Sequence, residues 1–205
     1  NGITRIEGTG RITAPGSGVV TTAKGGETLT SDHFVSAPGS EATGLKGITI
    51  DEKQIVSSTG ALALTKVPKR LVVIGAGYIG LEMATVWRRL GAEVEVVEYL
   101  PRILPGMDQE IATKFKTILE KDGISFRLGA AVTSAKTNKS GVVLDLDPAG
   151  GGDAEKITAD TVLVAVGRKA NTDGLGLDAI GLELDERGRI PVDEDFETAI
   201  PGVYA

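Results

Sequence analysis

The feature that most constrains this chain is a glycine-rich turn placed directly after a short apolar run. The run spans Leu71 to Ile74, and the turn reads Gly75-Ala76-Gly77-Tyr78-Ile79-Gly80. A second apolar run, 94–97, follows and ends at the acidic residue Glu98. A strand, a tight turn that opens a helix, a second strand and an acidic residue are the parts of a dinucleotide-binding βαβ unit. The sequence therefore predicts a parallel sheet with a nucleotide site at its first turn.

Each glycine of this turn has its own physical role. Gly75 permits a sharp change of direction, Gly77 lets backbone N–H groups approach a pyrophosphate, and Gly80 lets the helix pack closely on its strand. The negative phosphates would then lie at the positive end of the helix dipole. Turn formation without a ligand is the alternative interpretation of the same glycines.

Glu98 indicates which dinucleotide the site favours. Glu98 follows Gly80 by roughly 20 residues. At about this spacing, a carboxylate accepts hydrogen bonds from both hydroxyls of an adenosine ribose. This charge would repel a 2′-phosphate, so the sequence favours NAD over NADP. An acidic residue that only caps a loop is the alternative.

Two further residues lie where a cofactor could reach them. Glu82 is expected in the first turn of the helix. The helix dipole alone would favour an acidic residue there. The functional alternative is that Glu82 lies beside the nicotinamide. Gly167 follows the apolar run 161–166. Open α/β sheets bind ligands at the carboxyl ends of their strands, although a simple strand-ending glycine fits this position equally.

The composition excludes several classes of site. With 205 residues, 41% hydrophobic and 24% charged, the chain has an ordinary globular composition. Its net charge of −6, without a basic cluster, argues against a nucleic-acid surface. No apolar stretch approaches the roughly 20 residues that span a bilayer. The absence of cysteine excludes disulfides, thiolate zinc sites and thiol catalysis within the chain, and the single histidine, His33, is interpreted as structural.

The pattern of the chain changes near Lys69. Short β-prone segments with hairpin signals fill residues 1–40 and predict a small antiparallel meander. One helical turn is expected after an N-cap residue, either Ser58 or Thr59. From Lys69 onward strands and helices alternate, which predicts a doubly wound α/β domain of the Rossmann type.

The elements of this second part have clear limits in the sequence. A helix is predicted at 79–90 and ends at Gly91 in the left-handed conformation. Asp108 is expected to cap a second helix, whose apolar residues recur at helical spacing: Ile111, Phe115, Ile118 and Leu119. The predicted strands are 71–74, 94–97, 125–128, 132–135, 141–146, 156–158 and 161–166.

Two stretches make the chain recognisable. Residues 55–62 read IVSSTGAL, and residues 67–82 contain the glycine turn. Together with VVE at 96–98 and IPGVYA at 200–205, they resemble the two-dinucleotide flavoprotein disulfide oxidoreductases. The IVSSTGAL stretch and Glu98 resemble the dihydrolipoamide dehydrogenase branch of that family. The resemblance covers essentially the whole chain.

The resemblance implies an FAD domain, an inserted NAD domain and a carboxyl-terminal dimer interface. It assigns residues 1–66 to the rear part of the FAD domain, 67–186 to the NAD domain and 187–205 to a return into the FAD domain. The residues that would contact NAD are Gly75, Ala76, Gly77, Tyr78, Ile79, Gly80, Leu81, Glu82, Glu98, Val132 and Gly167. Those that would line FAD are Gly10, Pro38, Gly39 and Ser40.

The chain departs from the family pattern at several points. The turn on the FAD side is normally Ala-Thr-Gly, whereas here Pro38 replaces the threonine and removes a backbone donor and a hydroxyl. Ala170 stands where the family often has a proline. The redox cysteine pair and the catalytic His-Glu pair are missing, as is the lysine expected to pair with Glu82. Both ends look cut, and the chain resembles an excised middle piece.

The resemblance also implies an activity for the parent protein. It would oxidise protein-bound dihydrolipoamide to lipoamide and reduce NAD, with electrons passing through a redox disulfide and FAD. No catalytic residue lies in this chain, which is expected to be inactive alone. The implied partners are the lipoyl-bearing acyltransferase subunit of a 2-oxo acid dehydrogenase complex and a second copy of the parent protein. A bacterial cytoplasm or a mitochondrial matrix would fit.

Two alternatives remain open at this point. One is another flavoprotein disulfide reductase or a transhydrogenase, which shares the architecture. The other is a stand-alone nucleotide-binding module without catalysis. No nucleic-acid partner, membrane contact or metal site is expected.

Overall fold

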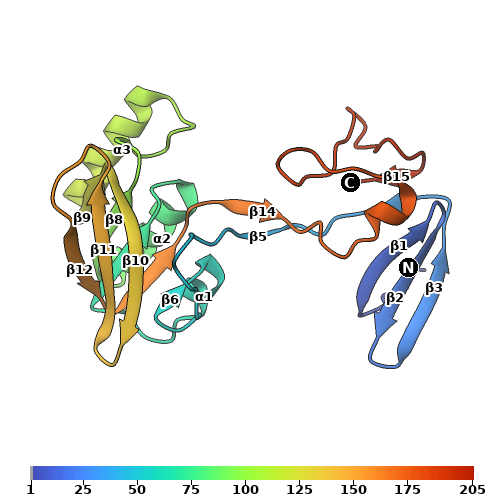
Figure 1. Ribbon diagram of the computed structural model, residues 1–205, viewed down its shortest axis with the longest axis horizontal. Coiled ribbons are helices and arrows are strands. Elements are labelled where there is room, and N and C mark those ends of the chain that lie inside the picture. The colour runs from blue at the N-terminus through green and yellow to red at the C-terminus, as the bar shows by residue number, and fades with distance from the viewer. Residues whose placement is uncertain (1) are drawn as a thin grey trace. The chain divides into compact units, whose positions relative to one another are not determined.

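The computed structural model describes residues 2–205. Most of its elements are labelled in Figure 1. The chain forms two compact units: Asn1–Glu41 with Lys169–Ala205 make unit 1, and Ala42–Arg168 make unit 2. The chain passes between them along β5 (Ser40–Ala42) and β14 (Arg168–Ala170), and these two strands pair with each other. The glycine turn belongs to unit 2.

Unit 2 is built on a five-stranded parallel sheet with the order β6-β13-β7-β8-β9. Strands β13 and β7 are apolar along nearly their whole length, as strands covered on both faces must be. The predicted Rossmann-type α/β fold is thereby confirmed, although β13 ends two residues earlier than expected. The strands are β6 (Ile55–Val56), β13 (Thr161–Val164), β7 (Arg70–Ile74), β8 (Glu93–Glu98) and β9 (Ile124–Leu128).

Two helices cover one face of this sheet. α2 (Tyr78–Arg89) begins directly after Gly77, and Gly91 beyond its end has the expected positive φ, 108°. α3 (Gln109–Lys121) is capped as predicted by Asp108, whose carboxylate accepts from two amides of the first turn. The core between the helices and the sheet contains these buried side chains: Leu71, Val73, Leu81, Ala84, Trp87, Val94, Val96 and Leu119.

The buried face of α3 differs from the predicted stripe. Ile111 and Ile118 each remain 54% exposed. Leu119 is buried and Phe115 packs against the same core, as predicted, whereas the third residue on this face is Ala112, which was not predicted. These three residues lie at i, i+3 and i+7, on the side of the helix that meets the sheet. The position of the sheet, and not the helical period alone, selects which apolar residues are covered.

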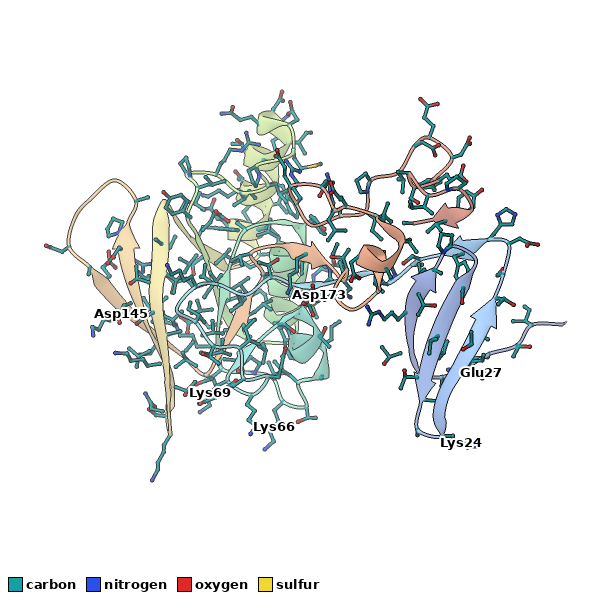
Figure 2. The ribbon with its side chains drawn as sticks, turned by 45° about the vertical axis from the view of Figure 1, so that its right-hand side comes forward. Lys24, Glu27, Lys66, Lys69, Asp145 and Asp173 are labelled. Carbon is teal, nitrogen blue, oxygen red and sulfur yellow. The ribbon has the colours of Figure 1, made fainter. Side chains whose placement is uncertain are left out.

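A three-stranded antiparallel sheet covers the opposite face of the parallel sheet. Its strands are β10 (Ala130–Asn138), β11 (Gly141–Pro148) and β12 (Glu155–Ala159), in that order. Asp145 on β11, labelled in Figure 2, accepts from Ser134 Oγ and pairs with Lys156 at 3.1 Å. The core of this face contains Val72, Ile74, Val97, Val132, Leu144, Leu146, Val162 and Val164.

The short helix α1 (Ser58–Ala63) precedes β7 in the chain. Its cap is Ser57, whose Oγ accepts from the amides of Thr59 and Gly60 at 3.2 and 3.4 Å. The predicted cap, Ser58 or Thr59, was therefore wrong. Three consecutive hydroxyl residues could all cap a helix, but the cap needs extended backbone, which Ser57 has with φ −79° and ψ 178°.

Unit 1 contains the predicted antiparallel meander. Strands β1 (Thr9–Ala14), β2 (Ser17–Thr22) and β3 (Gly25–Thr30) pair in sequence order, and Figure 2 labels Lys24 at the turn between β2 and β3. β4 (Phe34–Val35) pairs in parallel with β15 (Val203–Tyr204). The 3-10 helix η1 (Leu177–Ile180) was not predicted. A small core is formed by Ile12, Leu177, Ile180, Leu182 and Val203.

Candidate functional site

A cavity of about 480 Å³ opens in unit 2 at the carboxyl ends of β13, β7 and β8. Residues that end these strands line it, namely Val164, Ile74 and Glu98. Ligands of open parallel α/β sheets bind at this edge because the strands end there and the following loops diverge. The glycine turn leaves β7 at the same edge, so the sequence motif and the cavity coincide.

The glycine turn is tightly held against its surroundings. Gly75 has a φ of 106°, and its amide donates to Val97 O at 2.8 Å. A Cβ at Gly75 would lie 2.5 Å from Ala165 O, and one at Gly80 would lie 2.1 Å from Gly75 O. Only glycine fits these two positions, since real Cβ atoms do not approach a backbone oxygen so closely.

Gly77 is different, because it faces open space. A Cβ at this position would meet nothing within 4 Å, and Gly77 lines the cavity. It is also the N-cap residue of α2, and no side chain caps the amides of that helix terminus. The arrangement leaves an uncapped helix N-terminus beside a bare stretch of backbone at the cavity, which suits an anionic group.

Glu98 lines the same cavity and is bound to the turn. Its Oε2 accepts from the amide of Ala76 at 2.7 Å, and its Oε1 accepts from the amide of Leu100 at 2.9 Å. Glu98 is half-buried, and its carboxylate lies against the turn. Loop capping and a position at the cavity, which the sequence left as alternatives for Glu98, occur together.

The remaining predicted residues, apart from Glu82, fall into two groups. Tyr78, Ile79, Val132 and Gly167 line the cavity. Ala76, Gly80 and Leu81 are buried beneath the turn and do not line the cavity. Gly167 has a φ of 139°, and its carbonyl accepts from the amide of Thr43 at 3.0 Å.

Glu82 lies elsewhere than expected. α2 begins at Tyr78, one residue before the predicted start, so Glu82 is the fifth helical residue and no acidic residue occupies the first turn. The prediction of a first-turn position was wrong. The side chain is exposed and does not line the cavity of unit 2. The helix dipole therefore has less influence on this carboxylate than the sequence suggested, because its effect is concentrated in the first turn.

The four residues expected at FAD belong to unit 1. Gly10 and Pro38 line one cavity of about 380 Å³, whereas Gly39 and Ser40 do not line it. The Pro38 and Gly39 carbonyls accept from Asn171, the first from the side chain and the second from the backbone amide, both at 3.1 Å. The turn with the unusual proline is thus fixed by a residue that follows β14.

Several cavity residues had not been identified from the sequence. Ala130 and Ala131 begin β10, and Tyr99, Leu100 and Pro105 belong to the loop after β8. The loop residues directly follow Glu98, so their position at the strand edge could have been inferred. The alanines could not, since nothing in the sequence indicates that the antiparallel sheet lies across the parallel one.

The described residues, 2–205, lack both a metal-binding cluster and a membrane-spanning helix. They hold no cluster of three or more His, Cys, Asp or Glu side chains that could bind a metal ion. None of the helices found there is both long and apolar enough to cross a membrane.

Known proteins resemble this chain over its full length. The family described as "Pyridine nucleotide-disulphide oxidoreductase" matches residues 1–205. Leghemoglobin reductase of Vigna unguiculata is 51% identical over all of the chain and 39% of its own length. The mitochondrial dihydrolipoyl dehydrogenase of Pisum sativum and dihydrolipoyl dehydrogenase 3 of Pseudomonas putida are each 50% identical, over 41% and 44% of their lengths. The chain thus spans less than half of the curated relatives it matches.

Solved structures share the fold. The HOCl-induced flavoprotein disulfide reductase RclA from Escherichia coli, in a Cu(II) complex, superimposes with a TM-score of 0.88 at 26% identity. LpdA from Mycobacterium tuberculosis gives 0.87 at 26% identity. Each alignment covers 98% of this chain and 44% of the other. The fold, the cavity at the glycine turn and the full-length family match agree, and the chain belongs to the pyridine nucleotide-disulphide oxidoreductases.

Proposed function

We propose that this chain is the NAD-binding portion of a dihydrolipoyl dehydrogenase. The observation that carries the proposal is Glu98, whose carboxylate lines the cavity beside the glycine turn. The relatives named dihydrolipoyl dehydrogenase, which are 50% identical across the chain, support the same branch of the family. In the whole protein, dihydrolipoamide bound to a carrier would be oxidised to lipoamide and NAD would be reduced.

In this proposal the pyrophosphate of NAD lies at Gly77 and the N-terminus of α2. A bare backbone facing open space admits phosphate oxygens, and the uncapped amides supply donors. The contacts to NAD proposed from the family pattern extend from Gly75 to Glu82. Glu82 is exposed, so its proposed contact with the nicotinamide depends on parts of the whole protein that lie outside this chain. Gly167 is proposed to lie near the nicotinamide, and Val132 is proposed as a further contact to NAD.

Glu98 is proposed to select the adenosine ribose. A carboxylate has about four lone-pair positions, and two of them accept from Ala76 and Leu100. The others can accept from two ribose hydroxyls without disturbing the existing bonds. A 2′-phosphate would instead place two anions in contact, which disfavours NADP.

The flavin site is proposed for the other unit. Gly10 and Pro38 line the cavity of unit 1, with Gly39 and Ser40 in the adjoining turn. When bound in the whole protein, FAD would relay electrons between the redox disulfide and the nicotinamide. Residues 1–66 and 187–205 are proposed to belong to the FAD domain and residues 67–186 to the NAD domain.

The chain alone is proposed to be inactive as a dehydrogenase. It has no cysteine, and thiol–disulfide exchange with dihydrolipoamide requires one. For the whole protein we propose a homodimer that serves the lipoyl-bearing acyltransferase of a 2-oxo acid dehydrogenase complex. Its location would be a bacterial cytoplasm or a mitochondrial matrix, as the bacterial and mitochondrial relatives suggest.

A second candidate is another flavoprotein disulfide reductase, and one observation favours it. RclA, a flavoprotein disulfide reductase, shares the fold of this chain over 98% of its length. A transhydrogenase or a nucleotide-binding module without catalysis would also use the same cavity. Preference for NADPH would support a reductase of this kind, whereas preference for NADH supports the first proposal.

The test is calorimetric titration of the chain with NADH and with NADPH. Glu98→Arg should lower the affinity for NADH by tenfold to a hundredfold, on the order of 1.5–3 kcal/mol, and should shift the preference toward NADPH. The ratio of the two affinities is the decisive quantity, because the substitution also breaks the bond to Ala76. Glu93→Arg is the matched control, since Glu93 is 74% exposed at the opposite end of β8. An unchanged ratio in Glu98→Arg would remove Glu98 from its proposed role.

A further inference from the structure

The loop that follows β8 is held by an arginine without an acidic partner. Among residues 2–205, Arg102 forms no ion pair; its guanidinium instead donates to three backbone carbonyls, those of Ile103, Leu104 and Met107, at 3.5, 3.2 and 2.5 Å. A planar guanidinium with five donors can hold several carbonyls at once. The side chain therefore fixes the conformation of its own loop.

This loop contains a residue in an unfavourable conformation. Leu104 has a φ of 46°, in the left-handed region. This conformation costs a non-glycine residue about 1 kcal/mol or more. The Leu104 carbonyl accepts from Arg102 and from the amide of Met107 at 2.9 Å. Leucine has no intrinsic preference for this backbone geometry, so the hydrogen bonds around Leu104 and its packing against the core must maintain it.

The consequence of this conformation reaches the glycine turn. The amide of Leu104 donates to the carbonyl of Ala76 at 2.9 Å. The amide of Ala76 donates to Glu98 at 2.7 Å. Both backbone groups of the residue between Gly75 and Gly77 are therefore fixed from outside the turn, one by the strand end and the other by the loop that Arg102 closes.

We propose that Arg102 is a positioning residue of the nucleotide site, which closes the loop 99–108 so that the Leu104 amide holds the Ala76 carbonyl. The inference rests on the proposed function, because the turn it positions is the one that would receive the pyrophosphate. Arg102 itself does not line the cavity. Its effect on nucleotide affinity passes through Leu104 and Ala76 alone.

The experiment compares three variants of the 205-residue chain with the unaltered chain. Arg102→Gln removes the guanidinium and its charge, and Arg102→Lys keeps the charge without the planar fork. Arg89→Gln is the matched control, since it removes one positive charge from an exposed position on α2. The first measurement is hydrogen exchange of the Ala76 and Leu104 amides without nucleotide, and the second is calorimetric titration with NADH.

We expect exchange at Leu104 to be about tenfold faster in Arg102→Gln and unchanged in Arg89→Gln. The Kd for NADH should rise about tenfold in Arg102→Gln, less in Arg102→Lys, and not in Arg89→Gln. Adding Leu104→Gly to Arg102→Gln should restore part of the affinity, because glycine adopts the left-handed conformation without a penalty. The double variant also loses the packing of Leu104 against the core. Compared with Arg102→Gln alone, it should therefore be less stable but bind NADH more tightly. A merely structural role of Arg102 would not produce these opposite changes.

Equal Leu104 exchange and equal NADH affinity in Arg102→Gln and Arg89→Gln would overturn the proposal. If Arg102→Gln does not fold, the same two measurements on Arg102→Lys decide, with the same comparison to Arg89→Gln. If the unaltered chain binds no NADH, the proposed function fails, and the exchange of Leu104 then decides whether Arg102 positions the turn.

Discussion

The contact between Gly80 and Gly75 allows a quantitative test of the glycine turn. Gly80 is the third residue of α2, and a Cβ there would lie 2.1 Å from the carbonyl oxygen of Gly75. The obstructing atom belongs to the backbone and cannot rotate away as a flexible side chain would. Gly80→Ala must therefore move the turn or the start of the helix by about 1 Å to reach an ordinary contact distance.

The expected change in the stability of Gly80→Ala combines one favourable and two unfavourable contributions. Alanine in a helix is favoured over glycine by about 1 kcal/mol. Forcing a methyl group into a packed site costs about 1–3 kcal/mol. Moving the Gly75 peptide also weakens the bonds from Gly75 to Val97 and from Ala76 to Glu98, each of about 1 kcal/mol. We expect a net loss of about 2–3 kcal/mol and a large loss of NADH affinity.

Gly77→Ala is the matched control within the same turn. Its Cβ would meet no atom within 4 Å, and its φ of −77° is accessible to alanine. Stability should change by less than about 0.5 kcal/mol. The added methyl would nevertheless stand on the cavity wall where the pyrophosphate is proposed to lie, so NADH affinity should fall by about a hundredfold, ~2.7 kcal/mol. The two variants separate the packing role of glycine from its role in leaving room for a ligand.

The assay is urea denaturation monitored by tryptophan fluorescence. Trp87 is the single tryptophan of the chain, lies in α2 and is 7% exposed, so it reports on the unit that contains the turn. NADH affinity is measured by calorimetry on the same samples. Equal stability of Gly80→Ala and the unaltered chain would refute the close approach of helix and turn, as would equal destabilisation by both variants.

Two further predictions concern charged groups away from the cavity. Glu95, with a side chain 12% exposed, lies between Arg70 at 2.9 Å and Arg127 at 3.1 Å; Glu95→Gln should cost about 2 kcal/mol in urea denaturation, whereas Glu155→Gln should cost less than about 1 kcal/mol because Glu155 is 56% exposed. Partial burial alone would raise the pKa of Asp51, but three following backbone amides donate to it and lower that pKa below 3.8. A lowered pKa stabilises the fold above 3.8, so Asp51→Asn should be less stable than the unaltered chain at pH 7, and the difference should disappear as the pH falls below 3.8 in denaturation titrations.

The βαβ unit could be predicted closely because its signals are local. The helix predicted at 79–90 is found at Tyr78–Arg89, and the strand predicted at 125–128 is found at Ile124–Leu128. Glycine at both ends of the helix sets its limits, since the backbone at Gly91 is open only to residues that tolerate a positive φ. The cavity followed from the same reasoning, because parallel strands end at one edge.

The walls of the cavity and the support of the turn could not be predicted. Arg102 binds carbonyl groups within five residues of itself, and no residue pattern in the sequence distinguishes this from an exposed arginine. The bond from Leu104 to Ala76 joins residues far apart in the chain and depends on a backbone conformation that leucine does not favour. Contacts of backbone groups carry no signature in residue type, so the structure was needed to find them.

The charge at Glu95 shows how register completes what residue type leaves open. An acidic side chain in a buried strand requires compensating partners, which the sequence alone does not identify. In the parallel sheet, Glu95 lies beside Val72 of β7 and Ser125 of β9. Arg70 and Arg127 stand two residues from those neighbours and therefore project from the same face. The strand order that the βαβ connections impose places both arginines within reach of Glu95. The sheet order therefore identifies the partners of the buried acid, and the need of that acid for partners supports the sheet order.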